Sequence, residues 1–141
     1  MYCSQNKIIL LISLMLLLSC KQTTQPSQMS PYDQWKSLNI HNYTIDQSRE
    51  CYCIGAGVTV RLTIQADTIA NVTKLSGTDT MFSQLYCTVD SLFAFIRRIP
   101  PDSLIVRYNS QYGYPEHLDL YPQMHPVDGG EVYETSNLQV N

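Results

Sequence analysis

The sequence is poor in basic residues and lacks the motifs of several common chemistries. Lys and Arg together number nine among 141 residues, and Arg97-Arg98 is the one basic doublet. Nucleic-acid binding depends on clustered Lys and Arg that neutralise phosphates, so the composition argues against nucleic acid as a partner. A glycine-rich phosphate loop, a Ser-His-Asp triad and a pair of glycosidase-like carboxylates cannot be argued from the sequence either. No cofactor is therefore expected, and an enzymatic activity is not favoured.

A long hydrophobic segment is missing as well. The longest nearly unbroken apolar run extends from Ile8 to Leu18, eleven residues of which Ser13 alone is polar. A membrane-spanning helix needs about 20 residues to cross about 30 Å of hydrocarbon, so this run is too short to span a bilayer. Its length, and the positive charge of Lys7 before it, are typical of the apolar core of a secretory signal peptide.

A cysteine follows this apolar run directly. Leu17-Leu18-Ser19-Cys20 resembles the bacterial lipobox, in which aliphatic and small residues precede an obligatory cysteine. In proteins with this signal the cysteine thiol receives a diacylglyceryl group, the chain is cut before it, and the new amine is acylated. The resemblance implies that residues 1–19 are a lipoprotein signal peptide and that Cys20 carries the lipid, palmitate included. Because two or more acyl chains anchor a protein stably, we expect a membrane-anchored protein of the cell envelope.

The predicted mature chain begins with a tether. Residues 21–29, KQTTQPSQM, are polar, contain a proline and show no periodicity, which is typical of a flexible linker. Lys21 stands where many inner-membrane lipoproteins have aspartate, so the expected location is the outer membrane, facing the periplasm or the cell surface. Residues 30–141 are expected to form one domain, and the mature chain has eight basic and twelve acidic residues, a net charge of −4.

Two helices are predicted from their capping residues and apolar spacing. Ser30 followed by Pro31 provides an N-cap and a proline at the first helical position, which predicts a helix over about 31–38. Thr88 caps a second predicted helix, and Pro100-Pro101 ends it. The apolar residues of this second helix fall at i, i+3, i+4 and i+7, and they are Val89, Leu92, Phe93 and Ile96.

Alternation of apolar and polar residues predicts the strands. The clearest alternation places Val58, Val60, Leu62 and Ile64 on one face. Further strands are predicted near 43–53, 104–108, 117–120 and 131–140, whereas 69–75 returns as a partner strand or extends the preceding one. Short turns between strands favour antiparallel pairing. The predicted fold is therefore a single small α+β domain of order α-β-β-α-β-β-β, with four to five antiparallel strands and two helices packed on one face.

Several motifs together resemble those of a known group of proteins. In chain order they are Trp35, Tyr43, Cys51-Tyr52-Cys53, Thr88-Val89-Asp90-Ser91-Leu92-Phe93, Val106-Arg107-Tyr108-Asn109, Tyr112-Gly113-Tyr114-Pro115, and Asp128 with Glu131. This order resembles that of small bacterial envelope lipoproteins with a domain of unknown function, which read Trp, Tyr, CxC, TIDxLF, YDxxYGYP and an acidic pair. The resemblance implies no activity. Asn109 replaces the usual aspartate, so a carboxylate at that turn is dispensable here, and Cys87 stands where an apolar residue or proline is common.

The cysteines of the predicted mature chain are odd in number once Cys20 is lipidated. Cys51, Cys53 and Cys87 remain, and thiols outside the cytoplasm tend to oxidise, so a structural disulfide is expected within this trio. In an extended segment Cys51 and Cys53 lie about 6.5–7 Å apart, at the edge of disulfide reach, and a direct bond requires a bend. Cys87 could instead pair with either and tie the sheet to the second helix. A thiol-redox role for Cys51 and Cys53 is less favoured, because such sites usually have CxxC at a helix start.

Five polar residues between 117 and 131 form a weaker candidate site. They are His117, Asp119, His125, Asp128 and Glu131. If the leucines at 118 and 120 face the core, His117 and Asp119 share the opposite face, and His125 could join them to hold zinc. A small metal-dependent factor or enzyme centred on His117, Asp119 and His125 is therefore an alternative. A solvated sheet face followed by a turn is favoured over it, since this spacing is common by chance.

Tyrosine is abundant, with ten residues in the chain. Tyr108, Tyr112, Tyr114 and Tyr121 surround the predicted 104–120 hairpin, and exposed tyrosines are favoured contact residues. We expect at least two of them near the surface. The leading hypothesis is thus a non-enzymatic binding or accessory module, anchored by its lipid, that contacts an envelope protein or a surface polymer through this hairpin.

Overall fold

The computed structural model describes residues 29–124 and 129–141. The predicted signal peptide, Cys20, most of the tether, and His125 lie outside these residues. The described chain forms α2 (Pro31–Ser37), β1 (Tyr43–Cys51), β2 (Val58–Gln65), β3 (Thr68–Ser76), α3 (Val89–Arg98), β4 (Leu104–Tyr108), β5 (Pro115–Leu120) and β6 (Glu131–Val140). Within these residues no helix is long and apolar enough to cross a membrane.

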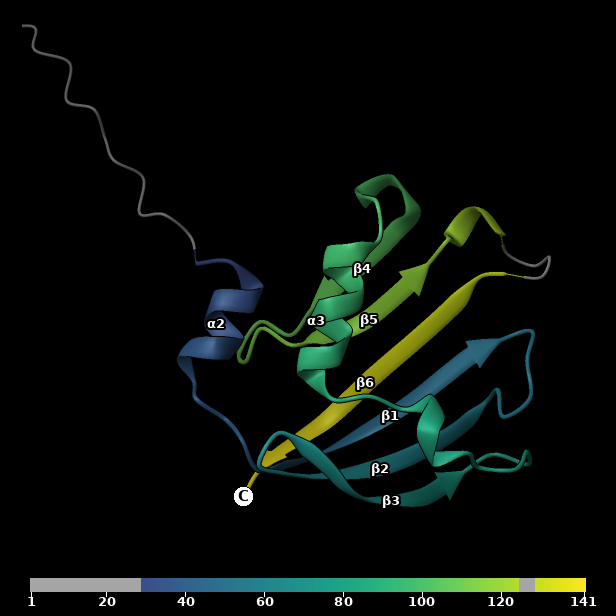
Figure 1. The fold of residues 1–141 in the computed structure, drawn as a ribbon, viewed down its shortest axis with the longest axis horizontal. Coiled ribbons are helices and arrows are strands. Elements are labelled where there is room, and N and C mark those ends of the chain that lie inside the picture. The colour runs from purple at the N-terminus through teal and green to yellow at the C-terminus, as the bar shows by residue number, and fades with distance from the viewer. Residues whose placement is uncertain (1–28, 125–128) are drawn as a thin grey trace, which may run out of the picture.

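The strands form one six-stranded sheet of order β3-β2-β1-β6-β5-β4 (Figure 1). Every neighbouring pair is antiparallel, so the sheet consists of two three-stranded meanders that meet where β1 pairs with β6. Helix α3 lies across one face of the sheet, whereas α2 lies beyond the end of the sheet, beside the connection between β4 and β5 (Figure 1).

The predicted order α-β-β-α-β-β-β, the count of four to five strands and the packing of both helices on one face are wrong. The observed order is α-β-β-β-α-β-β-β with six strands, because residues 68–76 form the separate edge strand β3. Most of β3 is exposed, so its sequence lacks the alternation that marks a half-buried strand. Ala66 and Asp67 both have positive φ, 47° and 63°, which is the conformation of a tight two-residue hairpin turn.

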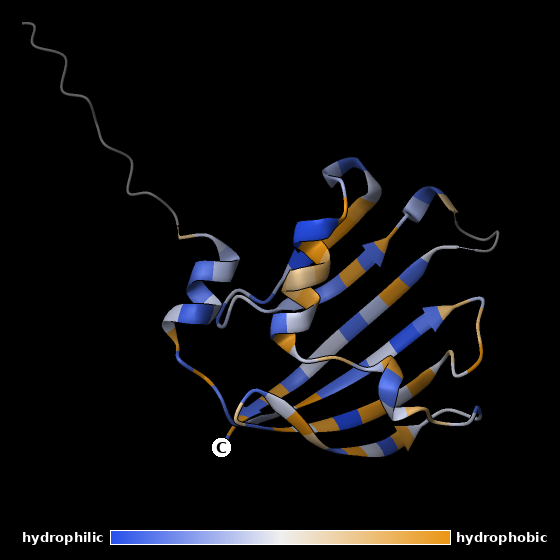
Figure 2. Ribbon diagram, viewed as in Figure 1, coloured by the Kyte–Doolittle hydropathy of each residue, from blue (hydrophilic) through white to orange (hydrophobic). Residues whose placement is uncertain are grey.

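The hydrophobic core lies between α3 and the covered face of the sheet. The alternation of β2 is confirmed, because Val58, Val60, Leu62 and Ile64 are all fully buried. Figure 2 shows the same alternation as bands of hydrophobic and hydrophilic residues along the strands. The opposite face is polar, and there Arg61 donates two bonds to Asp46, at 2.7 and 2.8 Å. One sheet face therefore supplies the core and the other remains polar.

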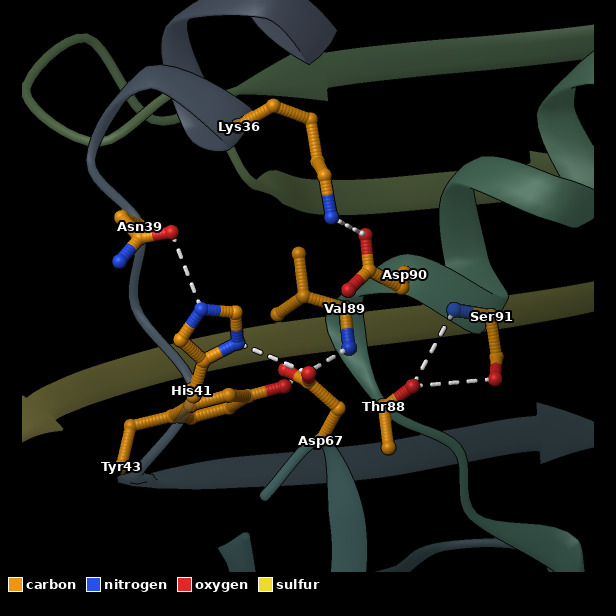
Figure 3. Close-up of polar contacts among 9 residues, drawn as sticks. All are labelled: Lys36, Asn39, His41, Tyr43, Asp67, Thr88, Val89, Asp90 and Ser91. Atoms are coloured by element: carbon orange, nitrogen blue, oxygen red, sulfur yellow. Dashed lines mark hydrogen bonds and ion pairs between the residues drawn. The ribbon is translucent and has the colours of Figure 1, made fainter. Parts of the chain in front are cut away.

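The start of α3 is fixed by two hydroxyl groups (Figure 3). The predicted cap is confirmed, because Thr88 Oγ1 accepts a bond from Ser91 N at 3.2 Å. The buried hydroxyl of Tyr43 accepts a second bond, from Val89 N at 3.1 Å, and burial raises the pKa of Tyr43. Strand β1 thus holds the first turn of α3 directly. Lys36 of α2 pairs with Asp90 at 3.4 Å on the same turn.

Candidate functional site

The hairpin tyrosines lie mostly within the structure. Tyr114 is 3 % exposed and belongs to the core, so it is not available as a contact residue. Tyr108 is half-buried and stacks on Phe93 with ring centroids 6.1 Å apart. Burial raises the pKa of both hydroxyls. Tyr112 is half-buried beside Tyr114, whereas Tyr121, after β5, is 37 % exposed. The hairpin is therefore chiefly a packing element.

The turn that contains the GYP motif packs directly against α2. Gly113 has φ +79°, and a Cβ there would lie 2.5 Å from the carbonyl oxygen of Pro31 and 3.1 Å from Cβ of Gln34. Gln34 also donates bonds to the carbonyl oxygens of Ser110 and Gln111, at 3.1 and 3.0 Å. Only glycine combines this conformation with so close an approach of two backbones.

Asn109 explains why an aspartate is dispensable at this turn. Its Oδ1 accepts bonds from Gln111 N at 3.0 Å and Tyr112 N at 2.8 Å, which closes the turn. An aspartate would accept the same two bonds. The amide also donates from Nδ2 to Glu116 Oε1 at 2.7 Å, which a carboxylate cannot do. Asn109 therefore stabilises the turn through its Oδ1, and its amide nitrogen adds a hydrogen bond to Glu116 that an aspartate would lose.

His117 and Asp119 face away from the core, on the polar side of β5. The leucines between and after them are buried at 0 % and 6 % exposure, as the alternation requires. His117 Nδ1 lies 2.6 Å from Glu134 Oε1 on the neighbouring β6. His125 lies outside the described residues. Within residues 29–124 and 129–141, no three His, Cys, Asp or Glu side chains gather as metal ligands would.

The disulfide joins Cys51 to Cys53, the two cysteines of the CxC motif. Strand β1 ends at Cys51, and the chain bends there, which brings the two Cα atoms to 5.2 Å. Cys87 is free, and burial raises the pKa of its thiol to about 12. It joins α3 to the sheet through its backbone, because Gln47 accepts from Cys87 N at 3.0 Å and donates to Cys87 O at 3.2 Å.

A charged cluster lies beside the disulfide. Arg49 of β1 forms an ion pair with Glu131 of β6, and both side chains are largely buried. The hydroxyl of Tyr133 donates to Glu131 Oε1 at 2.9 Å, and burial together with this carboxylate raises the pKa of Tyr133. The guanidinium also reaches Cys53, with Nη1 3.3 Å from Sγ. The ion pair therefore holds one arginine nitrogen against a disulfide sulfur.

The loop after the first cysteine, residues 52–57, carries the most exposed large hydrophobic residues. Tyr52 is 84 % exposed and Ile54 is 75 % exposed. We call residues 52–57 the distal loop, because it lies at the end of the sheet opposite α2 (Figure 1). Gly55 N donates to Asp79 Oδ2 at 3.1 Å, and Gly57 N donates to Arg49 O at 3.0 Å. With the disulfide, these bonds fix the backbone that presents the two side chains.

The strand register places Tyr121 near the distal loop. Glu131 pairs with Cys51 on one side and with Leu120 on the other. Tyr52 and Tyr121 follow these two partners in sequence, so their backbones lie about two strand spacings apart, roughly 10 Å. Sequence reasoning found Tyr121 but missed Tyr52 and Ile54 as exposed residues. The sequence signal that could have revealed this exposed loop is Cys51-Tyr52-Cys53-Ile54, in which two large apolar side chains alternate with two cysteines.

The fold and this end of the sheet define a small antiparallel α+β domain with an exposed apolar loop that begins at a disulfide. Residues 30–140 match a family of unknown function, DUF6174, and the chain belongs to this family. No curated protein and no solved structure matches the chain. The expected membership of a family of unknown function is thus confirmed, while the motif pattern given for it and its lipoprotein character stay predictions.

Proposed function

We propose that this chain is a lipid-anchored protein of the cell envelope whose domain binds another protein through the distal loop. The observation that carries the proposal is the exposure of Tyr52 and Ile54 on a loop whose first residues are held by the Cys51–Cys53 disulfide. Transfer of such a side chain from water into an apolar site stabilises a complex by about 1.5–3 kcal/mol. A loop already fixed by covalent and hydrogen bonds loses little conformational entropy when it binds.

A protein partner suits this loop better than a surface polymer. A tyrosine alone would suit a sugar ring, since aromatic faces stack on such surfaces. The neighbouring Ile54 gains only from an apolar pocket, which folded proteins supply and hydroxyl-rich polymers do not. The proposed partner surface is therefore an apolar pocket large enough for one aromatic and one branched aliphatic side chain.

The position of the loop also favours a partner in the aqueous part of the envelope. The described chain starts at Met29, next to α2, and the distal loop lies at the other end of the sheet (Figure 1). A tether of about ten residues reaches at most about 33–36 Å. With Cys20 in the bilayer, this arrangement lets the domain stand on its α2 end with the distal loop on the side away from the lipid.

Lipid anchoring is tested by Cys20→Ala, expressed as the full chain. The variant should keep its signal peptide uncleaved and lack the lipid mass. Cys3→Ala is the matched control and should be processed normally, because that cysteine would be discarded. Normal processing and lipid attachment in Cys20→Ala would refute the proposed anchor.

Binding is tested with the double variant Tyr52→Ser and Ile54→Ser. The full chain is titrated with the purified partner recovered by crosslinking from position 52, and the affinity should fall at least about a hundredfold, since two such side chains contribute about 3–6 kcal/mol and each 1.4 kcal/mol is tenfold. Ile105→Ser is the matched control, because Ile105 is 51 % exposed on β4. Equal affinities for the wild type and the double variant would contradict the proposal.

A further inference from the structure

We propose that the Cys51–Cys53 disulfide is also a thiol-exchange site that oxidises dithiols of envelope polypeptides. Cys53 is exposed and Cys51 is half-buried, and both line an open depression with Tyr52, Ile54 and Asp79. A sulfur in such a depression is accessible to an incoming thiolate. The activity uses the sulfur atoms of Cys51 and Cys53. It rests on the proposed envelope location, but it does not depend on a protein docked on Tyr52 and Ile54.

The two sulfurs have different electrostatic environments. Arg49 Nη1 lies 3.3 Å from Cys53 Sγ, so a thiolate on Cys53 would accept a bond from a cation. Cys51 is half-buried at the end of β1, and burial disfavours a negative charge on its sulfur. Thiol-exchange sites of the CxxC type use a helix N-terminus or a basic residue to stabilise one thiolate. Here Arg49 takes that role without a helix.

The position of Arg49 is itself fixed. Its Nε forms the ion pair with Glu131, which also accepts the hydroxyl of Tyr133 at 2.9 Å. Among the described residues, Glu50, Asp79 and Lys74 are further charged groups at this end of the sheet. The Asp79 carboxylate lines the same depression as Cys53 and accepts a bond from Gly55 N at 3.1 Å, whereas Lys74 donates to the Asp79 backbone oxygen at 2.8 Å. Arg49 is the charged group in direct contact with Cys53 Sγ, and charge interactions fall with distance.

The exchange consists of two displacements. A substrate thiolate attacks Cys53 Sγ, the Cys51–Cys53 bond breaks, and Cys51 leaves as a thiolate that takes a proton from water. The second thiol of the substrate, deprotonated by solvent, then attacks the substrate sulfur of the mixed disulfide, and Cys53 leaves as a thiolate beside Arg49. Two electrons pass from the substrate dithiol to the protein disulfide. The products are one substrate disulfide and the reduced pair Cys51 and Cys53, whose stabilised thiolate favours this direction.

The first test uses the oxidised full chain with reduced glutathione, a monothiol that stops the reaction at the mixed disulfide. Acid quenching and peptide mass mapping should locate the adduct on Cys53. In glutathione redox buffers of increasing pH, Arg49→Gln should leave the disulfide harder to reduce, by about threefold to tenfold near pH 8. The difference should vanish near pH 5, where both thiols are protonated. An adduct on Cys51, or a pH-independent effect of Arg49→Gln, would overturn the proposal.

A second measurement covers the case in which Arg49→Gln fails to fold. In the variant Cys51→Ser, with Arg49 intact, the rate of iodoacetamide alkylation at Cys53 is followed against pH. The midpoint should lie below the value of free cysteine, about 8.5. Cys53→Ser is the matched control, and its Cys51 should react with a midpoint at or above that value. Identical profiles for the two variants would refute the difference in thiolate stability between Cys51 and Cys53 on which the proposal depends.

Discussion

Replacing Gly113 with alanine tests whether the glycine of the GYP motif is needed for the close contact between this turn and α2. The residue has φ +79°, and its new Cβ would lie 2.5 Å from the carbonyl oxygen of Pro31. The left-handed conformation costs an L-residue about 1–2 kcal/mol. Moving α2 away from the new methyl group adds about 1–3 kcal/mol, as for other overpacked sites. The expected loss is about 2–5 kcal/mol from a total that is typically 5–15 kcal/mol.

Gly57→Ala is the matched control for the cost of placing alanine in the left-handed backbone conformation. Gly57 has φ +68°, close to that of Gly113, but a Cβ there would approach only the Glu50 carboxylate, at 3.8 Å. It should therefore lose about 1–2 kcal/mol, from the left-handed conformation alone. The difference between the two variants measures the close approach of α2 to the hairpin.

The single tryptophan of the chain makes the assay specific. Trp35 is 2 % exposed and lies on α2, with its ring edge-on to Tyr43 at 5.6 Å. Urea unfolding is followed by tryptophan fluorescence, which reports α2, and by far-ultraviolet circular dichroism, which reports the sheet. Gly113→Ala should lose more stability than Gly57→Ala, and its fluorescence transition should come first. Equal losses in the two alanine variants would refute the interpretation of the GYP motif.

Three further predictions concern buried polar groups. Tyr43→Phe should lower the free energy of unfolding by about 1–3 kcal/mol because the first amide of α3 loses its partner, whereas exposed Tyr52→Phe should change it by under about 0.5 kcal/mol. Hydrogen bonds from Arg61 hold the pKa of Asp46 below its usual range, so the stability they contribute is present above about pH 4 and lost as the pH falls. Arg61→Gln should therefore be less stable than wild type at pH 7, with the gap closing in acid urea titrations. Cys87, whose thiol pKa is raised to about 12 by burial, should resist iodoacetamide at pH 8 until urea unfolds the chain, and rapid labelling of the native protein would contradict this.

Local signals predicted the helices and the best strand correctly. Thr88 could be predicted as an N-cap because threonine is a preferred residue at that position. The four apolar residues of β2 indicate a buried face by their alternate spacing alone. Strand β3 was not counted because it is an edge strand whose burial is too slight to leave an alternating pattern. Pairing across the sheet follows from contacts between distant residues, and these have no local signature.

The candidate site was predictable only in part. Cys51 and Cys53 were identified from the compartment expected for the chain, but the bend that lets them join depends on the end of β1. Tyrosine is common both in cores and at interfaces, so its position in the sequence does not show which of the two Tyr114 occupies. Packing against residues distant in the sequence places it in the core. Arg49 beside Cys53 depends on the pairing of β1 with β6, which the sequence does not specify.

Photo-crosslinking in intact cells tests most directly whether the distal loop is the contact surface. A photoreactive amino acid is placed in the full chain at position 52, at position 112 in the hairpin, or at position 105 on β4, and crosslinked products are compared by mass. One discrete protein adduct should form from position 52, and it should be absent from positions 105 and 112. Formation of that adduct from position 112 but not from position 52 would contradict the account.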